Sequence, residues 1–491
     1  MLLGINQNTT GTTAAVFDST LSMVSVGHAR LERLTPRSGR VEIDPADLLA
    51  NVTLAVSRAL DTDDVDAADV DVVGLANQGE TALCWDADGR PLHNALVWQD
   101  RRTAGRCEQL LEDEDLSRYI KETTGLHIDP YFSATKLEWL VDHADADPSE
   151  LYCGTTDTWL LWQLLDDDPF VTDHATASRT MLFDLQRNQW DDRLREVFGL
   201  DDVQLPTPVA NDVVVGETDP DEFVGIDAPV AGCITNQQAA LYGQGCTSPG
   251  DTKCTYRTGS FILMNVGKTP AWYIDGISGT VAWTLDGETT YALDGGIYTT
   301  GAFIDWLVDS VEFLDEGDDT SALARSVPSS NGVYAVPALS GLASPYWDSS
   351  ARGAFVGLDS STTKAHLARA SLEGIAHRVR DVVDAMTDET VIEMDELKVD
   401  GELTANEFLL QYQADLLDHT LAVSAIPEAS ALGTATIAGE AVGLDVDTSR
   451  LGASERTVTS SRRTAALDDK HEEWQVVVEA IRDLSRKLDH A

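Results

Sequence analysis

A strand–turn–strand pattern that occurs twice constrains the fold of this chain more than any other feature. Residues 1–18, MLLGINQNTTGTTAAVFD, form a strand, a polar Gly/Thr turn and a second strand, and residues 251–268, DTKCTYRTGSFILMNVGK, repeat that order. Similar patterns at the heads of two halves indicate an internal duplication. We therefore predict an α/β fold of two lobes, residues 1–245 and 246–491, with a ligand cleft between them.

Helices are expected between and after the strands. Apolar residues recur at helical spacing over residues 47–60, 301–314 and 364–386. A final amphipathic helix over residues 472–491 is expected to cover a core rather than to hold a partner. The length of 491 residues suits two domains of about 200 residues or more.

The charge of the chain restricts its partners. A net charge of −49, from 83 acidic and 34 basic residues, disfavours nucleic acid and anionic membranes. A disordered acidic chain is the alternative, but 43% hydrophobic residues and 11 tryptophans favour a folded protein with an acidic shell, typical of a salt-rich cytoplasm. No apolar run reaches the length of a membrane span, and the first residues lack a basic region or cleavage site. We expect a cytoplasmic protein without membrane insertion.

Six cysteines are spread along the chain without a CxxC pair. Paired spacing is the usual sign of a metal site or a redox motif, and buried single cysteines commonly behave as small apolar residues. The spacing therefore predicts reduced, buried thiols and no disulfide framework or cysteine metal site.

Two polar turns carry candidate binding groups. The Gly/Thr turn after the first strand offers backbone N–H groups and hydroxyls to an anion, although most such turns are only hairpins. The segment AGCITNQQAALYGQG, residues 231–245, places Asn236 and Gln237 where a helix begins. Amides can hold a ligand by hydrogen bonds, but they cannot act as a base or balance a cation.

Longer strings over most of the chain resemble those of the glycerol kinases of the FGGY carbohydrate kinase family. They include NQGETALCWD, NALVWQDRRT, TGLHIDPYFSATKLEWLVDH, GTTDTWLLWQL, VTDHATASRTMLFD, GVYAVPALSGLASPYWDSSARGAFVGL and ALGTATIAGEAVG. The resemblance runs from about residue 3 to the end. It implies two actin-like, ribonuclease-H-like lobes that close on ATP, Mg²⁺ and a polyol such as glycerol.

The resemblance also implies that the polyol pocket is largely retained. Positions that hold glycerol in the family are occupied here by Glu80, Trp98, Tyr131, Gln237 and Phe261. An acid and an amide suit hydroxyl groups, and aromatic faces suit the carbon edge of a polyol. One member is absent, because the family's NQRE is NQGE here and Gly79 replaces an arginine that grips a terminal hydroxyl.

The positions that the family uses for its base and its metal are substituted. The family's GDQQAAL is TNQQAAL here, so Asn236 replaces the aspartate that takes the proton of the attacking hydroxyl. Loss of a general base typically costs about 10²–10⁴-fold in rate. The family's DQGTTSSR is NQNTTGTT here, so Asn6 replaces the aspartate associated with Mg²⁺.

The phosphate turns differ from the family pattern as well. In the first turn Asn8 replaces a glycine and Thr13 replaces an arginine; in the second, TYRTG replaces TYGTG, and Arg257 stands where backbone would meet phosphate. The family's DGG is DGE here, so Glu402 adds negative charge near the expected anions. The nucleotide contacts that the resemblance still implies are Thr9, Thr10, Thr258, Gly301 and Asn406.

Three hypotheses account for this pattern. The favoured one is a pseudokinase of the glycerol kinase type with a sensing or regulatory role, as a homo-oligomer or a hetero-oligomer with an active kinase paralogue, because several catalytic terms fail together. The alternative is an active ATP-dependent kinase of glycerol or a related polyol with rearranged chemistry, in which Glu80 or the substrate itself handles the proton and Arg257 clamps a phosphate. A structural partner without ligand is disfavoured by the retained pocket residues.

Overall fold

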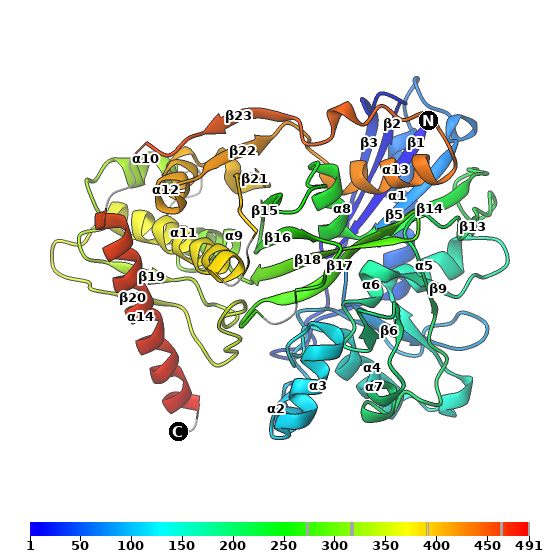
Figure 1. Ribbon diagram of the computed structural model, residues 1–491, viewed down its shortest axis with the longest axis horizontal. Helices are drawn as coiled ribbons and strands as arrows, with labels where there is room; N and C mark the ends of the chain where they lie inside the picture. Colours follow the sequence, from blue (N-terminus) through cyan, green and yellow to red (C-terminus); the bar gives the residue numbers. More distant parts are fainter. Residues whose placement is uncertain (272–273, 315–318, 389, 391, 462–464, 490–491) are drawn as a thin grey trace.

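The computed structural model describes residues 1–271, 274–314, 319–388, 390, 392–461 and 465–489. It confirms the predicted α/β fold of two lobes, each containing one large mixed sheet (Figure 1). The first sheet has the strand order β13-β14-β5-β1-β2-β3. The bounds of its strands are β1 Leu2–Asn8, β2 Gly11–Phe17, β3 Met23–Arg30, β5 Val72–Asn77, β13 Gly216–Glu217 and β14 Pro229–Thr235.

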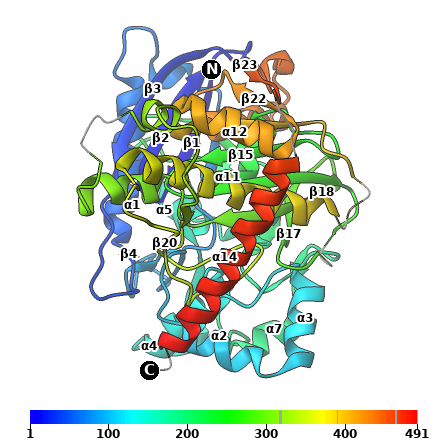
Figure 2. The same ribbon diagram turned by 90° about the vertical axis from the view of Figure 1, so that its left-hand side faces the viewer.

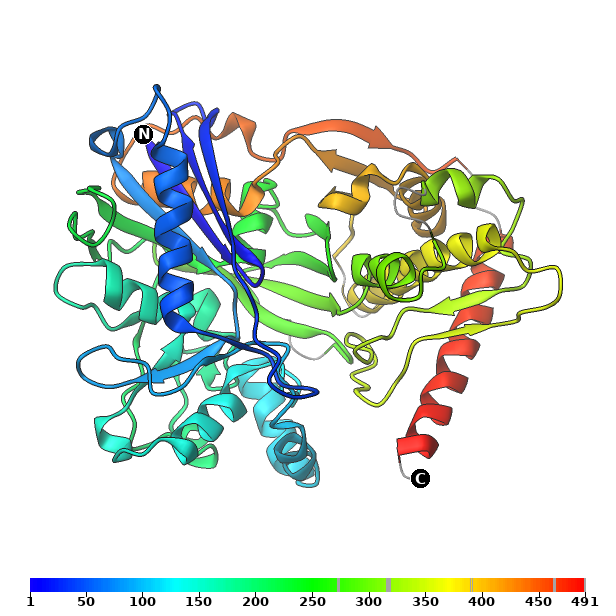
Figure 3. The same cartoon turned by 180° about the vertical axis from the view of Figure 1, so that it is seen from behind.

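Side chains alternate along β1, so its two faces meet two different helices. Leu3 and Ile5 share a core with α1 (Pro45–Leu60), whereas Leu2 shares one with α13 (Ala429–Ala441). Figure 1 shows α13 in front of this sheet, and Figure 3, the view from behind, shows α1 on the opposite face. A helix from late in the chain thus covers the first sheet and ties the two halves together.

Two glycines permit the close approach of α13 to the first sheet. A Cβ atom on Gly4 of β1 would lie 2.0 Å from the carbonyl oxygen of Ala431. One on Gly74 of β5 would lie 2.5 Å from the carbonyl oxygen of Thr434. The helix can lie this close only because both strand positions lack a side chain.

The second sheet has seven strands in the order β17-β18-β16-β15-β21-β22-β23. Their bounds are β15 Thr252–Tyr256, β16 Ser260–Gly267, β17 Ser278–Leu285, β18 Glu288–Ile297, β21 Glu396–Asp400, β22 Thr420–Ser424 and β23 Ser454–Val458. In both sheets three antiparallel strands are followed by two parallel ones, β3-β2-β1-β5-β14 and β18-β16-β15-β21-β22. This repeated order is what the paired turn motifs predict; a division of the chain at residue 245 stays a prediction.

The predicted helices are present with shifted ends. The first, α1, begins at Pro45 because the Asp44 side chain caps it by accepting from the Ala46 amide. Over residues 301–314 the helix is shorter than predicted: α9 (Gly301–Asp305) continues only as a π-type turn to Ser310. The long helix is α11 (Lys364–Asp388).

The remaining elements surround these sheets. The other helices are α2 Ala104–Leu111, α3 Glu114–Thr124, α4 Ser133–His143, α5 Thr156–Leu164, α6 His174–Ala177, α7 Asp192–Val197, α8 Asn236–Gly243, α10 Thr320–Arg325 and α12 Glu407–Leu417. The other strands are β4 Glu42–Ile43, β6 Ala82–Trp85, β7 Ala95–Leu96, β8 Tyr152–Thr155, β9 Val171–Asp173, β10 Phe183–Asp184, β11 Gln189–Trp190, β12 Thr207–Val209, β19 Tyr334–Val336 and β20 Ala354–Val356.

The closing helix, α14 (Ala465–Asp489), begins seven residues before the predicted start at residue 472, and residues 490–491 of the prediction lie outside the described residues. Figure 2 shows α14 running diagonally across one side of the molecule. Trp474 and Val478 are buried in a small core with Val336 of β19, and the Trp474 Nε1 donates to the Ala335 carbonyl at 2.9 Å. The helix therefore covers a core, as its amphipathic pattern predicts.

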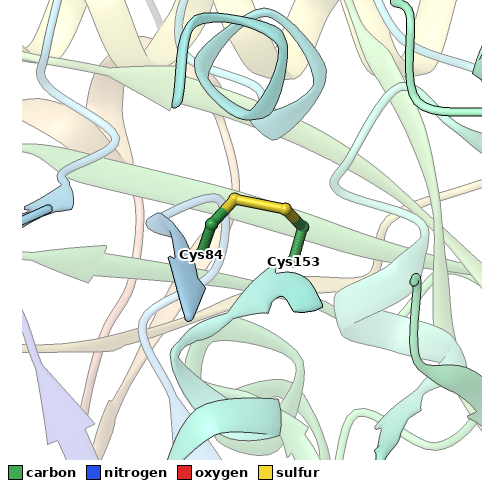
Figure 4. The surroundings of a disulfide bond; sticks show 2 residues. All are labelled: Cys84 and Cys153. Atoms are coloured by element: carbon green, nitrogen blue, oxygen red, sulfur yellow. A yellow bond between two sulfur atoms is a disulfide. The ribbon is translucent and has the colours of Figure 1, made fainter. Parts of the chain in front are cut away.

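The cysteine prediction is wrong for two of the six residues. Cys84 of β6 and Cys153 of β8 face each other in the antiparallel register of these strands and form a disulfide bond (Figure 4). They are 69 residues apart, so only the strand pairing, and no local spacing, brings them together. The other four cysteines are buried, free thiols, as predicted.

Neither a membrane-spanning helix nor a cluster of metal-binding side chains occurs among the described residues. None of their helices is both long and apolar enough to cross a membrane. No group of three or more His, Cys, Asp or Glu side chains among them is arranged to hold a metal ion.

Candidate functional site

A cavity of about 120 Å³ lies where the first hairpins of the two sheets approach each other. Its wall includes the β1–β2 turn, the β15–β16 turn, and the end of β14 with the first turn of α8. Strands β1, β5 and β14 are parallel, so their carboxyl ends lie at one edge of the sheet and deliver polar residues to the same place. This is the edge at which ligands bind in open α/β sheets.

All five side chains predicted to hold a polyol line this cavity: Glu80, Trp98, Tyr131, Gln237 and Phe261. The Trp98 ring lies edge-on to Tyr131 and Phe261, with ring centroids 5.5 and 6.1 Å apart. Its Nε1 donates to the Thr9 hydroxyl at 2.8 Å, which fixes the indole against the first phosphate turn. The aromatic group provides an apolar wall, and the acid and amide provide the polar groups.

Glu80 is a buried acid held in an unusual backbone conformation. Its φ is 65°, a left-handed value that a side-chain-bearing residue adopts only when its surroundings impose it. Its Oε1 accepts from the Arg179 Nε at 2.6 Å. Burial raises the pKa of the Glu80 carboxyl, and the Arg179 guanidinium opposes that rise. The acid therefore holds a proton more readily than an exposed glutamate.

Arg179 is a site residue that sequence reasoning missed. Besides Glu80 it binds Asp294 through Nη2 at 2.7 Å, and all three side chains line the cavity. A nearly fully buried arginine needs such partners, because an unpaired buried charge is costly. Arg179 stands within the string VTDHATASRTMLFD, and its position in that otherwise largely apolar and small-residue string was the available signal.

Asn236, at the position of the family's base, is engaged with a second substituted residue. Its Nδ2 donates to the Asn8 Oδ1 at 2.9 Å. The contact connects the first turn of α8 to the β1–β2 turn. Two amides thus meet where the family pattern has an aspartate and a glycine, and neither can take a proton.

Gln237 is oriented by a lysine that sequence reasoning also missed. Lys253 of β15 is fully buried, and its Nζ donates to the Gln237 Oε1 and, at 3.1 Å, to the Thr255 hydroxyl. A lysine ammonium can only donate, so Gln237 must present its oxygen to Lys253. Burial lowers the pKa of Lys253.

A second, smaller cavity of about 30 Å³ adjoins the first. Four residues line both: Asn8, Gln237, Thr255 and Arg257. Its other polar groups are the side chains of Asn6, Asp400, Glu428 and Ser430. The Asn6 Oδ1 and the Asp400 Oδ1 are buried without a hydrogen-bond partner among the described residues. Burial raises the pKa of Glu428, opposed by the nearby Arg257.

The predicted nucleotide contacts fall into two groups. Thr9, Thr10 and Thr258 line the larger cavity. Gly301 begins α9 behind the second turn, where its amide donates to the Arg257 carbonyl at 3.0 Å. Asn406 lines neither cavity and caps α12, with its amide oxygen accepting from the Leu409 amide at 3.0 Å. These roles in nucleotide binding stay predictions.

The remaining substituted positions have defined surroundings. A Cβ atom on Gly79 would lie 3.0 Å from the Thr235 Cγ2, so the cavity wall is tight there. Thr13 is hydrogen-bonded to His28 on the neighbouring strand at 3.0 Å. Arg257 is exposed on its turn and lines both cavities. Arg33, which the sequence did not single out, also lines the larger cavity and donates to the Gln99 Oε1 at 2.7 Å.

Known proteins resemble this chain along nearly its whole length. The FGGY family of carbohydrate kinases matches with its N-terminal domain over residues 1–243 and its C-terminal domain over residues 252–442. The chain is 41% identical to the glycerol kinase of Halorhodospira halophila over 496 residues, which cover 99% of this chain and 98% of that protein. It is also 41% identical to the glycerol kinase of Alkaliphilus metalliredigens over 448 residues, 90% of this chain and 89% of that protein.

Solved structures give the same result. The crystal structure of Plasmodium falciparum glycerol kinase with ADP matches with a TM-score of 0.88 and 31% identity, covering 98% of this chain and 97% of that one. The repeated sheet order, the cleft-lining turns and these matches agree with the resemblance inferred from the sequence strings. The chain belongs to the FGGY family of carbohydrate kinases and has its two-domain, actin-like α/β fold.

Proposed function

We propose that the protein is an ATP-dependent polyol kinase of the glycerol kinase type that phosphorylates glycerol or a similar small polyol. The observation that carries this proposal is the convergence of all five expected polyol-binding side chains on one cavity between the two phosphate turns. Relatives at 41% identity over nearly the whole chain are named glycerol kinases, which supports it further.

In this proposal Glu80 accepts the proton of the attacking hydroxyl. Asn236 cannot do so, and Glu80 is a carboxylate that lines the polyol cavity. Because burial raises its pKa, Glu80 is a stronger base once ionised than an ordinary glutamate. Trp98 and Phe261 hold the carbon edge of the polyol, and Gln237 donates to a hydroxyl.

The residues present also fit Mg²⁺ and the phosphates of a nucleotide. Mg²⁺ prefers oxygen ligands, and Asn6 and Asp400, each with a buried Oδ1 that has no partner among the described residues, line the small cavity together with Glu428. These three side chains would hold the ion, while Thr9, Thr10, Thr258 and Arg257 would meet phosphate oxygens. Bound MgATP supplies the phosphoryl group and neutralises its charge.

A second candidate function is a pseudokinase that binds a polyol without phosphoryl transfer and acts as a sensor or regulator. The contact that favours it is the hydrogen bond between Asn236 and Asn8, in which the residue at the base position is an amide that donates to another amide and cannot accept a proton. Pairing with copies of itself or with an active paralogue, and a cytoplasmic location, belong to this proposal as they do to the first.

The two functions are separated by glycerol-dependent ADP release in molar KCl. The wild type is compared with the N6D/N236D/R257G variant, which restores the family residues at the metal, base and phosphate positions. We expect measurable release by the wild type and faster release by the variant, because the restored base adds about 10²-fold or more. A silent wild type beside an active variant would establish the pseudokinase instead. Calorimetry with glycerol then shows whether that pseudokinase still binds a polyol.

A further inference from the structure

Basic residues outnumber acidic ones in the wall of the larger cavity, whereas acidic residues predominate in the chain as a whole. Three arginines and two acids line it, Arg33, Arg179, Arg257, Glu80 and Asp294. The whole chain has 34 basic and 83 acidic residues. The cavity wall therefore carries a slight excess of positive charge in a strongly acidic chain, and low-dielectric walls strengthen the effect of that charge on a ligand.

Arg179 forms an ion pair with each acid of the cavity, which leaves the Asp294 Oδ1 without a hydrogen-bond partner among the described residues. Its Nε and Nη2 bind Glu80 and Asp294 at 2.6 and 2.7 Å. Neither Arg33 nor Arg257 forms an ion pair with a carboxylate of any described residue, and Arg33 donates instead to the neutral amide oxygen of Gln99. Both arginines thus line the cavity without a direct ion pair, although Arg257 also lies near the Glu428 carboxyl of the smaller cavity.

Two amide side chains of the wall, Gln237 and Asn8, each keep a nitrogen free for a ligand. Lys253 takes the Gln237 Oε1, so the Gln237 amide nitrogen remains for a ligand. Asn236 takes the Asn8 Oδ1, so the Asn8 amide nitrogen remains as well. The wall keeps some acceptors, among them the Asn236 Oδ1 and the Asp294 Oδ1, but the guanidinium groups of Arg33 and Arg257 can only donate, and their charge favours an anion over a neutral polyol.

We propose that the ligand of this cavity is a small polyol that carries an anionic group, a carboxylate or a phosphate, and that Arg33 selects that group. The Arg33 fork can bind two oxygens of a carboxylate or phosphate side by side. Arg33 also stands on the polyol side of the cavity, beside Gln99 and Trp98, whereas Arg257 faces both cavities. The inference rests on the proposed polyol site but does not require phosphoryl transfer.

The test is calorimetry on the full chain in molar KCl, without nucleotide or Mg²⁺, using glycerol, glycerate and glycerol 3-phosphate as separate ligands. We expect one or both acids to bind at least about tenfold more tightly than glycerol, since charge-assisted hydrogen bonds are about twice as strong as neutral ones. Tighter binding of glycerate identifies a carboxylate ligand. Tighter binding of glycerol 3-phosphate alone identifies a phosphate.

Two variants complete the test. R33Q should remove most of the preference for the acid over glycerol, while R37Q, the same change at an exposed arginine of the same loop, should leave that preference unchanged. Equal affinity for glycerol and both acids, a preference that survives in R33Q, or no binding of any of the three would overturn the inference. If R33Q does not fold, the wild-type preference still decides. Kinase activity is measured separately, so either proposal can fail alone.

Discussion

At the scale of single residues, Glu80 is subject to two opposing influences. Burial raises its pKa and the Arg179 guanidinium lowers it, with burial the larger. As a proton acceptor it must be ionised, so the kcat/KM of the kinase should rise with pH through a value above the ordinary 4.5. We expect E80Q to lose about 10²-fold or more in kcat and to lose this acid limb.

D294N is the matched control for E80Q. It removes the other carboxylate bound to Arg179, with similar burial, so it disturbs the same ion-pair group without removing the proton acceptor. Melting curves of both variants report any loss of stability. An equal loss of kcat and an unchanged pH profile in the two variants would show that Glu80 only holds Arg179 in place.

The sequence predicted those site residues that could be identified from their own position in a matching string. Asn236 and Glu80 could be placed because their strings match a family pattern, and the structure brings both to one cavity. Arg179, Lys253 and Arg33 could not, because their importance depends on which residue each one meets. Arg179 meets Glu80 across 99 residues of sequence, and Arg33 meets Gln99 across 66. Such pairs are created by the fold, and a single sequence does not display them.

At the scale of elements, the contact between β1 and α13 depends on Gly4. A Cβ atom there would lie 2.0 Å from the Ala431 carbonyl oxygen, a backbone atom that cannot move without shifting the helix. We expect G4A to destabilise the protein by about 1–3 kcal/mol or more, as overpacking does. G105A is the control, because nothing lies within 4 Å of its new Cβ and Gly105 sits in helix α2, where alanine is favoured. Denaturant melts that show equal effects of the two changes would contradict this account of the packing.

Element pairing also explains the failed cysteine prediction. The existence of the Cys84–Cys153 bond follows from the register of β6 and β8, in which Ala82 faces Thr155 and Trp85 faces Tyr152. Hydrophobic patterns predict that a strand exists, but they do not specify its partner or register when both faces are buried. The repeated order of the two large sheets was predictable for a different reason, because the same strand–turn–strand motif occurs at residues 1–18 and again at residues 251–268.

At the scale of the whole molecule, we expect the excess of acidic residues to make the stability of the fold depend on salt. The acidic side chains that give the net charge of −49 repel one another. Salt shortens the range of that repulsion from about 10 Å at 0.1 M to about 3 Å at 1 M. Over the same range of KCl we expect the melting temperature to rise by more than about 4 °C, which corresponds to roughly 4 kcal/mol for a chain of 491 residues. Circular dichroism melts in graded KCl measure this rise.

The D61N/D63N/D64N variant tests whether charge repulsion is the cause. All three aspartates are exposed in one short loop, so their replacement lowers the local negative charge without removing buried contacts. At low salt the variant should melt at a higher temperature than the wild type, and the difference should shrink as KCl increases, because screening already suppresses the repulsion that the variant removes. A wild-type melting temperature that does not depend on KCl, or a difference that persists unchanged in molar KCl, would mean that the acidic surface acts by some other route than mutual repulsion.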